Sequence, residues 1–247
     1  MKIFNIKQTN RAIKKSHTRK WSVGLATAFA LLTATGQMPI LDSTFAGALS
    51  IDASPAPAIA QSNWASLEQD LITEHNRIRQ NPQSYIPLLE ARLASMDSRG
   101  NIPNGCGRNC TLLTNEGQSA VREAIQYLRN QPPVGAVSSS SGIAQAAKAH
   151  ATDQRNGSTG HRGSDGSSVM DRINRVGVGH TGVGENIAYG PSTAQDIMIN
   201  LIVDDGVPSR GHRTNIFRDR WNMAGAGCGP HATYRTVCVI NYTSSAR

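Results

Sequence analysis

Two histidines of this 247-residue chain stand in settings that suit chemistry. His161 and His212 each directly follow a glycine, in TGHRGSDG and RGHRTNIF. Glycine can adopt a positive φ or let the backbone approach another segment closely, so the histidine after it can be directed into a cleft. A neutral imidazole is a common metal ligand and a general base near pH 7. These two residues are the first candidates for a functional site.

Acidic residues in equally specific settings lie between the two histidines. Glu185 is surrounded by small and apolar residues in VGENIAYG, an unusual place for a solvated charge. Asp204 and Asp205 close an apolar segment with helical spacing. Sets of two histidines and two acids also arise by chance, so the pattern alone is a hypothesis.

Three serines near His161 offer a competing chemistry. Ser164, Ser167 and Ser168 could supply a nucleophile with that histidine as its base. The chain has no G-x-S-x-G nucleophile elbow and no strand–turn–helix pattern around these serines. A polar loop is therefore the favoured interpretation, and a serine hydrolase is a weak alternative.

Apolar spacing and breaker residues predict the elements that must position these residues. Helices are expected over residues 64–81, 84–94, 116–130, 143–155, 169–175 and 193–204. Residues 223–229 and 234–242 are expected to form a hairpin, since TVCVINY is rich in β-branched residues. Most of the predicted helices precede the predicted strands along the sequence. This order favours an α+β fold over a regular parallel βαβ fold.

The N-terminus carries most of the net charge of +8. Residues 1–48 contribute +6 of it, with seven basic residues and one acid, so the remainder is nearly balanced and no nucleic-acid partner is expected. Basic residues 2–20, the uncharged run 21–35 and an Ala-x-Ala site are typical of a secretory signal peptide. The uncharged stretch continues to Leu41, but Gln37 and Pro39 interrupt it, which argues against an uncleaved membrane anchor.

These features predict the domain organisation. The signal peptide covers residues 1–48, with cleavage as late as residue 60, an Ala/Pro/Ser-rich linker covers 49–63, and a folded domain covers 64–247. The mature protein is expected to be secreted or periplasmic, without a stable membrane span, and monomeric.

Four cysteines follow the signal segment. An even count in an exported chain predicts disulfides, with three possible connectivities. Cys228 and Cys238 flank a turn-like segment, so they are expected to face each other across the hairpin. Cys106 and Cys110 share a Gly/Asn-rich loop and are expected to pair with each other. Their spacing does not fit a C-x-x-C metal or redox motif.

Several motifs together resemble the CAP superfamily, which comprises cysteine-rich secretory proteins, antigen five and plant pathogenesis-related proteins. They are GHRGSDGSS, GENIAYG, RGHRTNIF and GCGPHATYRTVCVINY, preceded by LITEHNRIRQNP and AQAAKAHATDQ, which resemble two helices of the family. The resemblance covers roughly residues 65–244 and is nearest to the bacterial SCP-like branch.

The resemblance implies a three-layer α–β–α sandwich with a cleft that holds two histidines and two acids. His161 matches the first histidine, Glu185 the acid of the GEN motif and His212 the second histidine. Asp204 matches the second acid best, with Asp205 the next candidate; the family usually has the longer Glu there. The two imidazoles would hold Zn²⁺ weakly, because a catalytic zinc usually has three protein ligands and a structural one four.

The implied function is an exported binding module for a lipid, sterol, glycan or protein ligand. The family has no common reaction, so the resemblance does not decide whether the protein is an enzyme. The alternative is a metal-assisted hydrolase of esters or peptides, with Glu185 as general base and Asp204 as the second catalytic acid.

Overall fold

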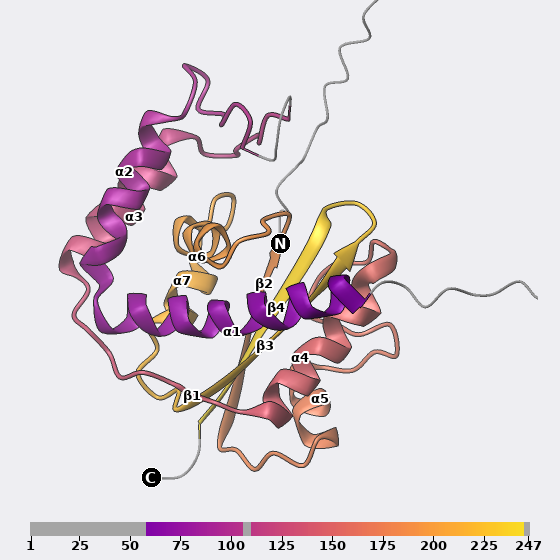
Figure 1. Cartoon of the computed structure of the whole chain (residues 1–247). Helices are drawn as coiled ribbons and strands as arrows, with labels where there is room; N and C mark the ends of the chain where they lie inside the picture. The colour runs from indigo at the N-terminus through magenta and orange to yellow at the C-terminus, as the bar shows by residue number, and fades with distance from the viewer. Residues whose placement is uncertain (1–57, 106–109, 245–247) are drawn as a thin grey trace, which may run out of the picture. The chain divides into compact units, whose positions relative to one another are not determined.

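Four strands form a mixed sheet at the centre of the α+β fold (Figure 1). The computed structural model describes residues 58–105 and 110–244. The strand order is β1-β3-β4-β2, where β1 is Ser138–Ser139, β2 is Gly182–Tyr189, β3 is Met223–His231 and β4 is Arg235–Ser244. β4 pairs antiparallel with both β3 and β2, whereas β1 runs parallel to β3.

Helices cover both faces of this sheet. They are α1 (Ala58–Gln80), α2 (Ile86–Ala94), α3 (Gln118–Asn130), α4 (Ser141–Asp153), α5 (Val169–Arg175), α6 (Ala194–Val203) and α7 (Gly211–Ile216). All six predicted helices and the C-terminal hairpin are confirmed, with ends that shift by a few residues. The sequence patterns missed β2, which lacks an alternating apolar pattern, and α7, which is too short to show a helical period.

Side chains of β4 alternate between two cores, one on each face of the sheet. Cys238 and Ile240 pack in the core that contains α1, α3 and α6. Val237 and Val239 pack in a separate core with α4. Because successive side chains of a strand point to opposite faces, β4 packs against helices on both sides of the sheet. The predicted α–β–α sandwich is confirmed.

Two glycines of β3 allow α4 to lie unusually close to the sheet. A Cβ atom built on Gly225 would lie 2.2 Å from the Ala144 nitrogen, and one on Gly227 would lie 2.1 Å from the Lys148 nitrogen. No side chain fits at these distances, so glycine is required for this close backbone approach.

The predicted Cys228–Cys238 disulfide is confirmed. The two cysteines are direct partners in the β3–β4 register, with Cα atoms 4.1 Å apart and sulfur atoms 2.03 Å apart. Both are buried in the larger core. The other predicted pair joins Cys110 to Cys106, and Cys106 lies outside the described residues.

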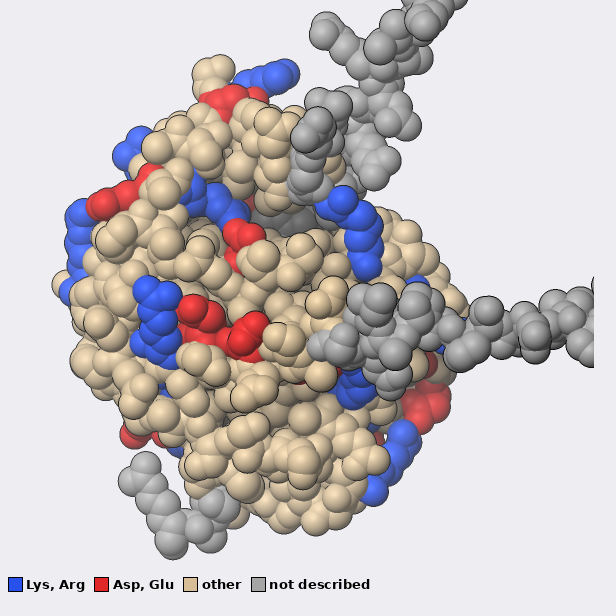
Figure 2. Space-filling model, in the orientation of Figure 1, with Lys and Arg blue, Asp and Glu red and all other residues tan. Residues whose placement is uncertain are grey.

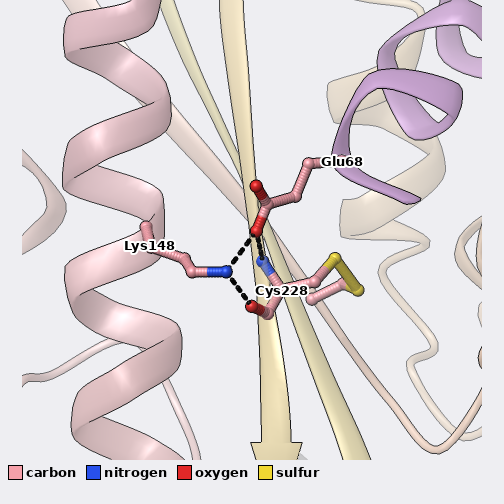
Figure 3. The surroundings of a disulfide bond; sticks show 4 residues. Glu68, Lys148 and Cys228 are labelled. Atoms are coloured by element: carbon pink, nitrogen blue, oxygen red, sulfur yellow. Dashed lines mark hydrogen bonds and ion pairs between the residues drawn. A yellow bond between two sulfur atoms is a disulfide. The ribbon is translucent and has the colours of Figure 1, made fainter. Parts of the chain in front are cut away.

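The backbone of Cys228 is also held by two side chains from opposite faces of the sheet (Figure 3). Glu68 of α1 accepts a hydrogen bond from the Cys228 N–H at 2.7 Å, and Lys148 of α4 donates to the Cys228 carbonyl at 2.6 Å. Glu68 and Lys148 also form an ion pair at 2.6 Å. Free N–H and C=O groups on a strand edge invite pairing with another chain. The pair therefore ties α1 and α4 to β3 and closes its edge at Cys228.

We expect Glu68→Ala to lower the free energy of unfolding by about 1.5–3 kcal/mol, the range for a lost hydrogen bond to a charged group. Urea denaturation measures this loss. The matched control is Glu90→Ala, because Glu90 forms an exposed ion pair with Arg129 at 3.8 Å, and such surface pairs contribute less than about 1 kcal/mol. Equal losses in the two variants would show that the Cys228 contacts add nothing.

The start of α1 differs from the expectation for the N-terminal part. The helix begins at Ala58 rather than at Trp64, so it includes the last residues of the predicted 49–63 linker. Pro57 is the last proline before the helix, and the Ala and Gln residues after it are good helix formers. The predicted signal peptide lies outside the described residues. Within 58–105 and 110–244, no helix is long and apolar enough to cross a membrane.

Charged side chains of both signs are interspersed on the face drawn in Figure 2. Arg77 lies 3.3 Å from Glu74, and Arg210 lies 2.7 Å from Glu116. Basic side chains of the described residues are thus paired with acidic ones in several places, and the face drawn in Figure 2 shows no single basic surface.

Candidate functional site

His161 is joined to Glu185 although 24 positions separate them. His161 lies in the loop before α5, and Glu185 lies in β2. The His161 Nδ1 atom is 2.8 Å from Glu185 Oε1. We call this pair the first carboxylate–imidazole dyad.

The Glu185 carboxylate is buried and satisfied by several donors. Its side chain is 2% exposed, and Arg172 Nη2 donates to Oε2 at 2.7 Å. With the Asn241 amide oriented so that its nitrogen faces Glu185, that nitrogen donates to Oε2 at 2.9 Å. The carboxylate is thus held by Arg172 and Asn241 in a position where it contacts His161.

The second dyad joins Asp204 to His212. Asp204 ends α6 in the left-handed conformation, with φ of 52°. Its Oδ1 lies 2.6 Å from His212 Nδ1, and its Oδ2 accepts the His212 backbone N–H at 2.9 Å. This bend in the chain brings the short aspartate side chain onto the histidine eight positions later.

Asp205, the other candidate for the second acid, points to a different part of the fold. Its carboxylate accepts the backbone N–H groups of Asn115 at 2.6 Å and Glu116 at 2.7 Å. It therefore anchors the segment before α3. Of the two adjacent aspartates, Asp204 is the one that contacts a candidate histidine.

Both dyads are attached to neighbouring residues of β2, an edge strand of the sheet. Glu185 shares a strand face with Ile187, which packs beside α4. Asn186 faces the other side, where its Nδ2 donates to the His212 carbonyl at 3.0 Å. The two histidines therefore reach the edge strand from opposite sides of the sheet.

The glycine before each histidine acts differently in the two cases. Gly160 has a φ of 104°, a conformation that glycine adopts without strain, and it turns the chain so that His161 faces β2. Gly211 is the first residue of α7, and positive φ occurs instead at Arg210, with φ of 50°. Of the two expected uses of glycine, a positive φ is confirmed before His161, whereas Gly211 before His212 has neither a positive φ nor a close backbone approach.

The carboxylates define which ring nitrogen remains available. Each contacts Nδ1, so Nδ1 carries the hydrogen and Nε2 keeps its lone pair. Within the described part of the chain, no hydrogen bond reaches Nε2 of His161 or His212. The side chain of His161 is 46% exposed and that of His212 is 14% exposed. Each ring therefore keeps a nitrogen that can accept a hydrogen bond or bind a metal.

The next question is whether the described side chains could coordinate the predicted Zn²⁺. Among residues 58–105 and 110–244, no group of three or more His, Cys, Asp or Glu side chains is arranged to hold a metal ion. Glu185 and Asp204 are already committed to the imidazoles. The described residues therefore do not supply the three or four ligands of a typical protein zinc site.

Two of the three serines of the alternative site, Ser164 and Ser168, have structural contacts instead. Ser164 is hydrogen-bonded to Asp153 through both its N–H and its hydroxyl. Ser168 caps α5 and shares a reciprocal pair of hydrogen bonds with Asp171. Such capping contacts account for these two serines as parts of a loop and a helix start.

Two further histidines are buried inside helices, as packed residues. His75 of α1 and His150 of α4 are fully buried. Burial, together with the nearby Arg79 guanidinium, lowers the pKa of His75 to about 3. Burial is also the main cause that lowers the pKa of His150. Both rings are therefore neutral at pH 7.

Arg172 and Asn241 are the site residues that sequence reasoning missed. Arg172 lies in the short helix α5, and Asn241 is the partner of Glu185 in the β2–β4 register. Neither position carries a local signal, because an arginine in a helix and an asparagine near a strand end are ordinary. Their roles depend on the pairing of segments that are distant in sequence.

A family model described as the cysteine-rich secretory protein family, CAP, matches residues 122–242. This range contains Glu185 and all the other dyad residues. A comparison with curated protein sequences finds no match.

Two solved structures show limited similarity. One is an extracellular protein containing an SCP domain from Bacillus anthracis, with 22% identity over 52% of this chain and a TM-score of 0.40. The aligned part spans 39% of that chain. The other is BmVAL-1, with 11% identity, a TM-score of 0.32, and coverage of 73% of this chain and 78% of that one.

Proposed function

This chain belongs to the cysteine-rich secretory protein (CAP) family, and from that membership we propose that it is an exported ligand-binding protein with a two-histidine site at β2. The observation that supports this proposal is the pair of dyads on adjacent residues of one edge strand. Each dyad fixes a ring through Nδ1 and leaves Nε2 for a ligand. The ligand classes to test are lipids, sterols, glycans and proteins.

A divalent cation such as Zn²⁺ would be held by Nε2 of His161 and Nε2 of His212. When bound, it would supply a Lewis acid for an oxygen of the ligand. Glu185 and Asp204 would orient the two rings and raise their basicity. With two protein ligands, the affinity is expected to be low and the cation exchangeable.

Binding is favoured over metal-assisted hydrolysis by the surroundings of Glu185. A general base must be able to take up a proton from the attacking water. The Glu185 oxygens already accept hydrogen bonds from His161 and Arg172. This carboxylate is thus placed to support a histidine, which serves binding directly.

Zinc titration of the purified full chain by calorimetry tests the site. We expect saturable binding in the native chain, loss of binding in the His161→Ala/His212→Ala variant, and retention in a His180→Ala control, because His180 contacts Asn174 and belongs to neither dyad. Unchanged zinc binding in the double variant would refute the two-histidine site.

The same samples are then tested for ligand and activity. Phosphatidylcholine vesicles, cholesterol and a glycan array probe binding, and ester and peptide panels probe hydrolysis with and without Zn²⁺. Saturable retention of one probe class supports the binding function. Turnover that requires both histidines would instead establish the hydrolase.

The two adjacent aspartates give a sharper test of the second dyad. We expect Asp204→Asn to weaken zinc binding by about 10–100-fold, as is typical when a carboxylate partner of a ligating histidine is lost. Asp205→Asn should leave zinc binding unchanged and lower thermal stability, because Asp205 holds the segment before α3. The reverse order of zinc affinities would assign the supporting role to Asp205.

A further inference from the structure

Three successive peptide groups around His161 are hydrogen-bonded to neighbouring elements. The Gly160 N–H donates to the Tyr189 hydroxyl at 2.9 Å, and the Gly160 carbonyl accepts from Gln154 Nε2 at 2.7 Å. The His161 carbonyl accepts from both Nη atoms of Arg172 at 3.2 Å. The surrounding loop is rich in Gly and Ser, whose small side chains bury little apolar surface. These hydrogen bonds therefore hold the backbone that carries the imidazole.

The Tyr189 hydroxyl and the Gln154 amide complete this network. The hydroxyl accepts the Gly160 N–H and donates its own hydrogen to Gln154 Oε1 at 2.6 Å. This contact orients the amide so that its nitrogen faces the Gly160 carbonyl, which also has His150 Nε2 at 2.9 Å. Burial raises the pKa of Tyr189 to about 12, so the hydroxyl keeps its hydrogen at neutral pH. Tyr189 therefore acts on both sides of Gly160, directly on the N–H and through Gln154 on the carbonyl.

β2 provides the contacts to both the ring and the backbone of this loop. Tyr189 follows Glu185 by four positions, and alternate residues of a strand share one face of the sheet. Glu185 contacts His161 Nδ1 at 2.8 Å, whereas Tyr189 contacts the residue before His161. β2 is paired with β4 along its whole length. The spacing of the two contacts is therefore set by a hydrogen-bonded strand and not by the loop.

The exposure of His161 makes this backbone contact important. Its side chain is 46% exposed, so packing alone leaves the ring room to change rotamer. Gly160, with φ of 104°, adds conformational freedom directly before it. Loss of the Tyr189 hydroxyl would leave the Gly160 N–H and Gln154 Oε1 without their partner, and the loop would gain alternative conformations. The ring would then contact Glu185 for less of the time, since holding one rotamer has an entropic cost.

We propose that Tyr189 is a positioning residue of the two-histidine site, whose hydroxyl fixes Gly160 and thereby holds the His161 ring against Glu185. Its importance for zinc rests on the proposed function, whereas its effect on the ring does not. Within the described residues Tyr189 contacts neither Asp204 nor His212, so the second dyad serves as an internal control.

Tyr189→Phe removes only the hydroxyl, and Tyr234→Phe is its matched control. The two rings lie 5.5 Å apart in one aromatic cluster, and within the described residues the Tyr234 hydroxyl makes no hydrogen bond. Long-range proton–nitrogen NMR of the full chain at about pH 8, above the ordinary histidine pKa, shows which ring nitrogen carries the hydrogen. We expect Nδ1–H for His161 in the native chain and in Tyr234→Phe, and a partial shift to Nε2–H in Tyr189→Phe. His212 should keep Nδ1–H in all three proteins.

Zinc titration of the same three proteins measures the consequence for binding. We expect zinc affinity to fall about 3–10-fold in Tyr189→Phe, less than the loss typical for a direct partner of a ligating histidine, and to stay unchanged in Tyr234→Phe. Thermal midpoints establish that each variant is folded.

The two measurements separate the positioning role from the proposed function. Unchanged His161 nitrogen shifts in folded Tyr189→Phe, or equal changes in Tyr234→Phe, would overturn the role of Tyr189 whether or not zinc binds. Absence of zinc binding in the native chain would instead refute the two-histidine site, and the His161 shifts would still decide whether Tyr189 positions the ring.

Discussion

Replacing Arg172 by methionine is expected to lower the free energy of unfolding by about 3–5 kcal/mol, the usual cost of removing one partner of a buried ion pair. The guanidinium donates to Glu185 Oε2 at 2.7 Å, to the Ser167 carbonyl at 3.0 Å and to the His161 carbonyl at 3.2 Å. Its loss would leave the buried Glu185 charge poorly compensated and would release the loop that carries His161. Urea denaturation measures the first effect, and zinc titration measures the second.

The same short helix supplies the control for Arg172→Met. Arg175 pairs with Asp165 at 2.8 Å, but its side chain is 59% exposed. Surface ion pairs contribute little to stability, so Arg175→Met should change the unfolding curve only slightly. Adding Glu185→Gln to Arg172→Met should recover part of the loss, since it removes the unpaired charge. Equal losses for the two arginine variants would refute the buried role of Arg172.

The stability of the domain should fall as the pH is lowered below 6.5, the ordinary pKa of histidine. Burial lowers the pKa of His75 in the folded state to about 3. Between these values the unfolded chain binds one more proton than the folded chain, so the contribution is complete above pH 6.5 and is lost toward pH 3. The slope is about 1.4 kcal/mol per pH unit, or about 3 kcal/mol by about pH 4.5. His150, whose pKa burial also lowers, adds to the loss in the same direction.

His75→Phe separates this effect from general acid denaturation. Phenylalanine keeps a ring beside Tyr242, whose ring centroid lies 5.2 Å from that of His75. It also removes two ring nitrogens that lack a hydrogen-bond partner among the described residues. The variant should be at least as stable as the native chain at pH 7 and should show a shallower slope below pH 6.5. Urea denaturation across a pH series measures both.

An acidic residue provides the comparison for the pH series. Hydrogen bonds from Ser167 lower the pKa of Asp165, so its contribution is present above its ordinary pKa of 3.8 and is lost only as the pH falls below it. Asp165→Asn should therefore change only the most acidic part of the curve. If the free energy of unfolding of His75→Phe falls between about pH 4.5 and 6.5 as steeply as that of the native chain, His75 is excluded as the titrating group.

Local patterns were sufficient for most elements and for one disulfide. Apolar spacing, prolines and glycines identified the six longer helices and the hairpin, because each signal lies within a few neighbouring residues. The turn-like segment between Cys228 and Cys238 was enough to predict their pairing, since hairpin partners are close in sequence. β2 escaped prediction, because its stability depends on β4, which follows it more than forty residues later.

The amino-acid sequence alone thus specified the α+β class and singled out His161, Glu185, Asp204 and His212 as candidates. Their assembly was decided by the tertiary structure. Asp204 rather than Asp205 contacts His212, because α6 ends in a left-handed residue. Arg172 and Asn241 hydrogen-bond the buried Glu185 carboxylate, which in turn contacts His161. Such contacts join segments far apart in the chain, and a side chain's partners there depend on packing that no local pattern encodes.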